Sequence, residues 1–235
     1  MPKAPPPPMP DPNASPAALR AQILATEHWG LLAARTTTQN EVLTRISMFL
    51  TFVSATLVSL ALVGQATGFG SAFPMFAIAV LTVALVVGIL TQVRVFNVAT
   101  EDLMYVIAMN RLRAAYAELA PGVEKWFMKS AHDDQAGSVQ TYYFFRPSRG
   151  GSVVLGSSMR FIAVVNAALS GLLAAAVVAL LTASLPVAVV VAVSTAVVYF
   201  VAGILLGYRA YGLVWTHHVP LSPTPRVVDG ASGRR

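Results

Sequence analysis

Two long stretches of the chain contain no ionisable side chain except two tyrosines. Neither 46–93 nor 161–208 contains Asp, Glu, Lys, Arg or His, and both Tyr199 and Tyr208 lie in the second stretch. A helix that crosses a membrane needs about 20 apolar residues, so each stretch is too long for one span and fits two spans joined by a turn. The sequence therefore predicts an all-α, polytopic integral membrane protein with four transmembrane helices arranged in two hairpins.

The turns and prolines within these stretches predict where each span begins and ends. The first hairpin is expected at 38–93, with spans at 46–64 and 74–93 around a glycine-rich turn. The second is expected at 159–208, with spans at 161–181 and 186–208. Thr38 and Glu41 have the spacing of a capping box just before an apolar run, so we expect a new helix to start at 38.

The segments outside the spans differ in character. Residues 1–15 are proline-rich and predict a disordered tail, and 16–37 predicts a helix that starts at Ser15-Pro16. Residues 94–158 predict a helical segment followed by a loop. Its helix should run from the second span to Pro121-Gly122, with a short helix near 123–131 and irregular structure at 132–156. The tail 209–235 is expected to be disordered after His218.

Composition agrees with a membrane protein, and charge predicts its orientation. The chain is 56% hydrophobic and 11% charged, whereas a soluble domain is about 45–50% apolar and roughly 25% charged. All formal charges lie in 1–45, 94–160 and 209–235, which four spans place on one side. Because positive flanks resist translocation, we expect that side, with both termini, to be cytoplasmic, and the membrane to be the cell membrane.

Small and mildly polar residues within the spans predict close packing between helices. The candidates are Ser47, Thr51, Ser54, Asn166, Ser170, Gly203 and Gly207. The three hydroxyls of the first span share one face, where they can bond across a helix interface or back to their own backbone, or else line a polar path. Asn166 is expected to face another helix, and the two glycines form a GxxxG step that lets backbones approach closely.

The helix predicted at 94–120 has two apolar stripes rather than one. The candidates for contact with a second subunit are Leu103, Val106, Asn110, Leu112 and Tyr116. A helix that is apolar on two sides usually packs on two sides. Either one stripe contacts the chain's own helices and the other a second subunit, or both belong to one broad interface within the monomer.

Candidate chemistry is sparse. The chain has no cysteine and no nucleotide, hydrolase or metalloprotease motif, so neither cofactor nor metal is predicted. His132-Asp133-Asp134 could ligate a metal, but neighbouring residues rarely converge on one ion, and a solvated loop is favoured. Glu101 and Asp102 should diverge on their helix. The aromatic run 142–145 favours internal packing over a membrane surface, and binding to nucleic acid is unlikely.

Three functions are compatible with this pattern. The first is a non-enzymatic membrane component that self-associates or binds another membrane protein through its cytoplasmic helices, with the lipid bilayer around its spans. The alternative is a pore or transporter subunit for a neutral or weakly selected solute. An enzyme with its site at the cytoplasmic interface ranks third. The spans lack the intramembrane charges that ion-coupled transport usually needs.

Overall fold

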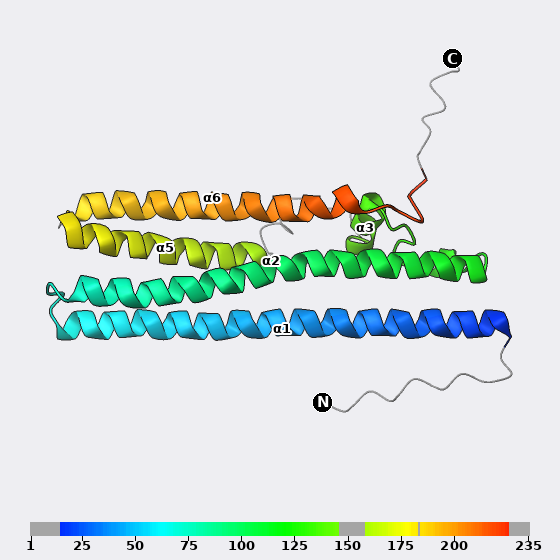
Figure 1. Ribbon diagram of the computed structural model, residues 1–235, viewed down its shortest axis with the longest axis horizontal. Coiled ribbons are helices and arrows are strands. Elements are labelled where there is room, and N and C mark those ends of the chain that lie inside the picture. The colour runs from blue at the N-terminus through cyan, green and yellow to red at the C-terminus, as the bar shows by residue number, and fades with distance from the viewer. Residues whose placement is uncertain (1–14, 146–157, 183, 226–235) are drawn as a thin grey trace, which may run out of the picture. The chain divides into compact units, whose positions relative to one another are not determined.

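A computed structural model describes residues 15–145, 158–182 and 184–225, and over this range the chain contains helices and no strand (Figure 1). The helices are α1 (Pro16–Ala66), α2 (Phe73–Leu119), the 3-10 helix η1 (Val123–Trp126), α3 (Gln135–Tyr142), α5 (Ser158–Thr182) and α6 (Leu185–His217). Four of them, α1, α2, α5 and α6, are long and apolar enough to cross a membrane. The prediction of an all-α chain with four such helices is confirmed.

Helix α1 is continuous, so the prediction of a new helix at residue 38 is wrong. The segment between Gly30 and Gly64 contains neither glycine nor proline, and therefore nothing in it breaks the helix. Two threonine hydroxyls in this region form hydrogen bonds to backbone carbonyls one helical turn earlier. Thr36 donates to the carbonyl of Leu32 and Thr44 to that of Asn40, both at 2.9 Å. The capping-box pattern at 38–41 is a local signal for a helix start, but the residues on both sides of it are helical and α1 continues through it.

The second helix continues far beyond the predicted span, as expected, and ends before Pro121-Gly122. The following segment differs from the prediction. The short helix is limited to η1, and the stretch expected to be irregular contains α3. The Asp134 side chain caps α3 by accepting a hydrogen bond from the Gly137 amide at 2.7 Å. This aspartate supplies the start signal that a search for apolar periodicity overlooks.

The chain divides into two compact units. The bundle unit comprises 37–100 and 149–216, and the terminal unit comprises 1–36, 101–148 and 217–235. Helices α1 and α2 each contribute residues to both units, whereas α5 belongs to the bundle unit alone and α3 to the terminal unit alone.

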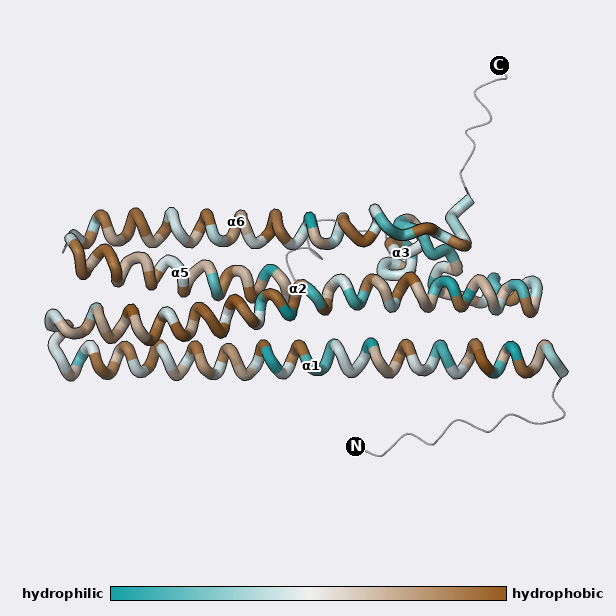
Figure 2. Tube along the Cα trace, in the orientation of Figure 1, coloured by the Kyte–Doolittle hydropathy of each residue, from teal (hydrophilic) through white to brown (hydrophobic). Residues whose placement is uncertain are grey.

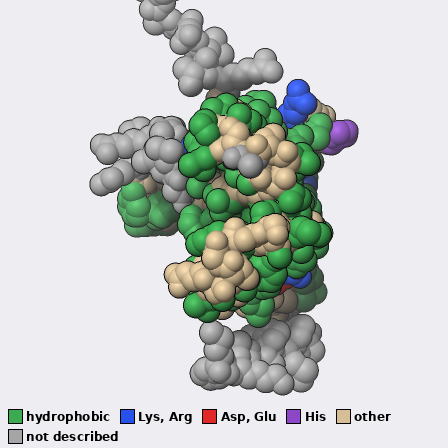
Figure 3. All heavy atoms as spheres, turned by 90° about the vertical axis from the view of Figure 1, so that its left-hand side faces the viewer, with side chains coloured by type: hydrophobic (Ala, Val, Ile, Leu, Met, Phe, Trp, Pro, Cys, Tyr) green, Lys and Arg blue, Asp and Glu red, His purple; other side chains and the backbone are tan. Residues whose placement is uncertain are grey.

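The bundle unit has a small apolar core, and hydrophobic residues predominate along its four helices (Figure 2). Phe49, Leu81, Ala84, Ile162 and Leu169 are buried in the core. Leucines and valines also cover the outside of the four helices, and the end of the bundle that carries the two turns shows hydrophobic and uncharged polar groups (Figure 3). Helices that are apolar on all sides are typical of membrane spans.

Two helices of the bundle unit approach closely at Gly88. A Cβ atom on Gly88 would overlap Asn166 Oδ1 and would lie 2.8 Å from Phe49 Cζ. Asn166 is fully buried, and its amide nitrogen donates to Gln92 Oε1 at 2.7 Å. The absence of a side chain at residue 88 therefore lets α5 place its buried amide directly against α2.

We expect Gly88→Ala to destabilise the bundle unit, because the new methyl group displaces a buried amide that has no other room. Overpacking of this kind costs about 1–3 kcal/mol. The matched control is Gly212→Ala on α6, where an added Cβ meets nothing within 4 Å and the change should be neutral or slightly stabilising. Thermal unfolding in detergent measures both. Equal melting temperatures for the two variants would contradict the close approach.

Candidate functional site

Buried polar side chains are concentrated in the terminal unit, where Asn110 lies at the centre of one network. Asn110 is fully buried. Its amide nitrogen donates to the His132 carbonyl at 2.8 Å, and its oxygen accepts from Arg113 Nη1 at 2.6 Å and from the Thr141 hydroxyl at 2.9 Å. One side chain of α2 thus binds both the 130–134 segment and α3.

Asp133 holds the segment that follows α6. Its carboxylate is fully buried and accepts hydrogen bonds from the amides of Leu221 at 3.0 Å and Ser222 at 2.8 Å, and from Arg111 Nε at 2.7 Å. The Asp133 amide donates to the Ser222 carbonyl at 3.1 Å, and the Asp133 carbonyl lies 2.6 Å from His218 Nε2. The side chain and the backbone of Asp133 together bind the segment from His218 to Ser222.

Asp134 extends the same contact. Besides capping α3, its carboxylate accepts from the Thr224 amide and the Thr224 hydroxyl, each at 2.8 Å. We call Asp133 and Asp134 the acidic cradle. Gly137 makes it possible, because a Cβ on this residue would overlap the His132 carbonyl oxygen.

The hydrogen bonds keep both carboxyl groups of the cradle ionised. Burial by itself would raise the pKa of Asp133, but the bonds from Leu221, Ser222 and Arg111 outweigh it and hold that pKa below its ordinary value. Burial would likewise raise the pKa of Asp134, but hydrogen bonds from Gly137 and Thr224 outweigh the effect of burial and lower this pKa below its ordinary value. The charge of each carboxylate is therefore used to bind backbone.

These contacts correct two predictions. The segment His132-Asp133-Asp134 is not a solvated loop, since Asp133 is fully buried and both carboxylates are occupied by hydrogen bonds. The tail after His218 is described as far as residue 225 and is bound to the cradle over 218–224, whereas 226–235 lies outside the described residues, as do 1–14. Over the described range, no group of histidines and carboxylates is arranged to hold a metal ion.

A third carboxylate, that of Asp102, links three helices of the terminal unit. Asp102 accepts two hydrogen bonds from Arg35, at 2.6 and 3.1 Å, and one from the Tyr142 hydroxyl at 2.7 Å. A bidentate arginine–carboxylate pair is geometrically specific. It joins α1 to α2 while the tyrosine joins α3 to the same oxygen pair, so Asp102 has a positioning role in the terminal unit.

The candidate subunit contacts on α2 have partners within the chain. Leu103, Val106 and Asn110 are fully buried, and Leu112 and Tyr116 are half-buried. The Tyr116 ring stacks on His28 of α1 at a centroid distance of 6.1 Å. A second subunit reaches Leu103 or Val106 only if this packing opens, so the burial of these two residues favours the internal interface over a subunit contact at this position.

The candidates for packing between spans fall into two groups. Ser47, Thr51 and Ser54 are exposed on α1, and each hydroxyl donates to the carbonyl one turn back, at 2.9–3.0 Å. They therefore use the backbone alternative rather than a contact across helices. The other four candidates are buried inside the bundle unit: Asn166, Ser170, Gly203 and Gly207.

Gln92 is a residue that sequence analysis overlooked. Its Oε1 accepts from Asn166 Nδ2 at 2.7 Å and from the Tyr199 hydroxyl at 2.9 Å, which joins α2, α5 and α6. A Cβ on Gly203 would lie 3.0 Å from Gln92 Nε2, so Gly203 makes room for this amide. The available signal was a polar amide inside the second predicted span, two residues before Arg94.

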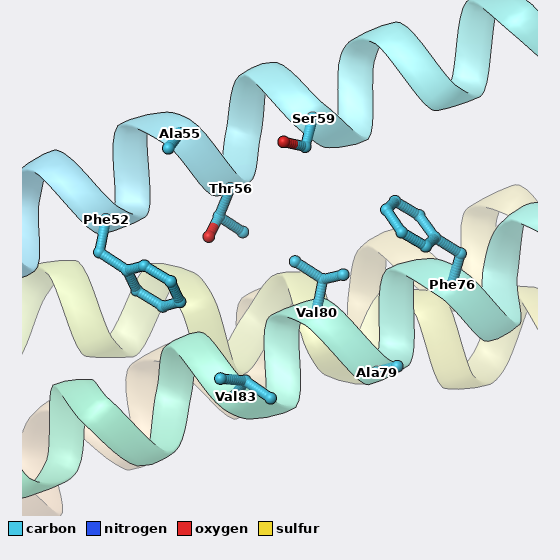
Figure 4. Close-up of a pocket in the computed structure, with 8 residues that line it drawn as sticks. All are labelled: Phe52, Ala55, Thr56, Ser59, Phe76, Ala79, Val80 and Val83. Atoms are coloured by element: carbon cyan, nitrogen blue, oxygen red, sulfur yellow. The ribbon is translucent and has the colours of Figure 1, made fainter.

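The bundle unit also has a groove between α1 and α2, with a volume of about 390 Å³ (Figure 4). It is lined by Phe52, Ala55, Thr56, Ser59, Phe76, Ala79, Val80 and Val83. No lining residue is titratable, and the only polar groups are two hydroxyls. The groove fits an apolar chain and has no group for acid–base catalysis or metal binding.

Comparisons with protein-family models, with curated proteins and with solved structures found no match to this chain. The interpretation of function therefore rests on the contacts described above.

We expect Asp133→Asn to loosen residues 219–224. Asparagine has one acceptor oxygen where the carboxylate uses two, so its amide group faces a backbone donor and leaves it unpaired. An unsatisfied buried donor costs about 1–3 kcal/mol, which corresponds to roughly tenfold or faster amide exchange through local opening. Hydrogen exchange at neutral pH, followed by mass spectrometry, measures it.

Glu118→Gln is the matched control, because Glu118 is an exposed carboxylate of the same unit whose ion pair with Arg20 is long, at 3.5 Å. Exchange in 219–224 should stay unchanged in this variant. An Asp133→Asn protein with wild-type exchange in that segment would contradict the role of the cradle.

Acid should act like the Asp133 substitution. Folding lowers the pKa of both cradle aspartates, so their contribution to stability is present above the pKa of an unfolded aspartate, about 3.9. It is lost as pH falls through the lower, folded values. We expect cleavage within 218–225 by an acid-active protease to rise as the pH falls below about 3.9. Cleavage that stays constant down to the acid unfolding of the whole protein would contradict this expectation.

Proposed function

We propose that the chain is a multi-pass protein of the cell membrane in which α1 with α2, and α5 with α6, form two hairpins. The proposal is supported by the exposed apolar side chains over 46–93 and 161–208 and by the position of the charges, all of which lie in 1–45, 94–160 and 209–235. Excess arginine and lysine next to the spans favours a cytoplasmic location for these segments. Both termini and the terminal unit are then cytoplasmic.

Reporter fusions test this topology. Fusions at Thr67 and Ser184 should report the outside, because both residues lie in the turns between spans. Fusions at Gln135 and Ser232 should report the cytoplasm. A fusion at Gln135 that reports the outside would overturn the proposed orientation.

For the function itself, we propose a non-enzymatic membrane component that self-associates through the terminal unit. The observation that carries this proposal is the exposure of two tryptophans: Trp29 on α1 is 71% exposed and Trp126 in η1 is 74% exposed. Apolar side chains on the bundle unit face lipid in this account, but those on a cytoplasmic unit face water. Tryptophan is enriched among the residues that dominate binding energy at protein interfaces.

Self-association is tested by native mass in mild detergent. The wild-type protein should be oligomeric, and Trp29→Ser or Trp126→Ser should shift the mass toward the monomer, because truncating an interface tryptophan typically costs about 2 kcal/mol or more. Glu27→Gln is the control, since it changes an exposed residue of the same helix without removing apolar surface. A monomeric wild-type protein that also captures no other membrane protein would refute the proposal.

A pore or transporter subunit for a neutral solute is the second candidate. It is favoured by one observation: Asn166 Oδ1 is buried in the bundle unit and has no hydrogen-bond partner. A solute with a hydroxyl or amide donor would satisfy this oxygen once the close packing against Gly88 opens. Proteoliposomes loaded with a neutral polyol should then release it, and Asn166→Leu should abolish the release. Release equal to that of empty liposomes would exclude this function for the solute tested.

A further inference from the structure

Arg113 is a buried cation that forms no ion pair with a carboxylate among the residues that the structure describes. The residue is 8% exposed. Its Nη1 atom donates only to neutral oxygens, Asn110 Oδ1 at 2.6 Å and the Ser130 carbonyl at 3.4 Å. Buried arginines are normally paired with an anion, because the charge loses its hydration. Arg35, in the same unit, differs from Arg113 because its charge is neutralised by the carboxylate of Asp102.

Two further basic residues adjoin the segments that contact Arg113. Lys129 precedes Ser130, whose carbonyl accepts the Arg113 hydrogen bond, and the Lys129 ammonium lies 5.8 Å from the Phe144 ring centre. His28 stacks on Tyr116, which follows Arg113 by one turn of α2. His28 and Lys129 are half-buried, whereas Arg113 is buried, so the first two residues can be reached from solvent.

The cluster contains unsatisfied hydrogen-bonding capacity. His28 Nδ1 is buried and has no partner. Within the described parts of the terminal unit, 15–36, 101–145 and 217–225, no carboxylate forms an ion pair with His28, Arg113 or Lys129. Burial, followed by the positive charge of Arg113, lowers the pKa of both His28 and Lys129. The charge of Lys129 also lowers the pKa of His28, and the charge of Arg35 also lowers the pKa of Lys129.

We propose that His28, Arg113 and Lys129 form a binding site for a phosphate-type oxyanion. Such an anion accepts several hydrogen bonds at once and supplies the negative charge that the cluster lacks. The planar guanidinium of Arg113 matches two phosphate oxygens, the ammonium of Lys129 provides a mobile donor at the rim, and His28 donates from its unpartnered nitrogen. Tyr116 holds the His28 ring in place.

The phosphate group has two possible sources, a soluble phosphate compound or the headgroup of an anionic lipid. Both present the same oxygens to the cluster, and the experiment separates them by changing only the carrier of the phosphate. The site goes beyond the proposed self-association, because it uses none of the exposed tryptophans.

The first arm titrates inorganic phosphate into the purified full-length protein in a neutral detergent, at constant ionic strength, by calorimetry. Losing one charge-assisted hydrogen bond costs about 1.5–3 kcal/mol, so Lys129→Gln should weaken binding roughly ten- to a hundredfold. His28→Gln should weaken it as well. Lys125→Gln is the matched control: it removes the same charge from an exposed lysine that lies over Trp126 instead.

The second arm reconstitutes the same proteins into nanodiscs of phosphatidylcholine with or without phosphatidic acid, and native mass spectrometry measures lipid retained by the protein. A lipid source predicts that wild type and Lys125→Gln retain phosphatidic acid and that Lys129→Gln does not. Lys129-dependent binding in either arm supports the site and identifies its source. Binding in neither arm, or equal binding by the Lys125 and Lys129 variants in both, overturns it.

Discussion

A polar group that leaves water must find its partner inside the protein, and this constraint governs both units of the chain. In the bundle unit, Asn166 and Tyr199 both donate to Gln92, which ties three apolar helices together at one point. In the terminal unit, the Asp133 carboxylate is fully buried and accepts hydrogen bonds from two backbone amides and an arginine in place of water. Apolar packing alone allows helices to slide, whereas these directional bonds select one arrangement.

The same constraint explains how the terminal unit is assembled from distant parts of the chain. Its hydrogen bonds join α1 to α2 through Arg35 and Asp102, and join residues 133–134 to 221–224. None of these partners is close in sequence. The ends of α1 and α2, the segment with α3 and the residues after α6 are each too short to fold alone. They form one unit because their buried polar groups bond to one another.

Sequence patterns were sufficient for everything that depends on local composition. The uncharged stretches 46–93 and 161–208 predicted four long apolar helices, and the lack of a breaker after Arg94 predicted that α2 extends to Pro121. Local signals failed where competing interactions decide. The capping box at Thr38 was overridden by the continuous α1, and a start signal at Asp134 was hidden in a stretch of glycines and polar residues.

The candidate sites were predicted less well, because they depend on contacts between distant residues. Nothing near Asp133 in the sequence indicates that its carboxylate binds the amides of Leu221 and Ser222, so a solvated loop was the natural expectation. The apolar spacing of Leu103 and Val106 predicts a packed face, and both residues are buried within the chain itself. Periodicity identifies a face that packs and does not identify what covers it.

The carboxylates of Asp133 and Asp134 hold residues 221–224 in place within the terminal unit. The most direct test is the distance between two spin labels, one at exposed Gln135 and one at exposed Pro225, in otherwise wild-type protein, a design made simple by the absence of cysteine. The account predicts a single narrow distance distribution at neutral pH that broadens in Asp133→Asn. A broad distribution in the wild-type background would contradict it.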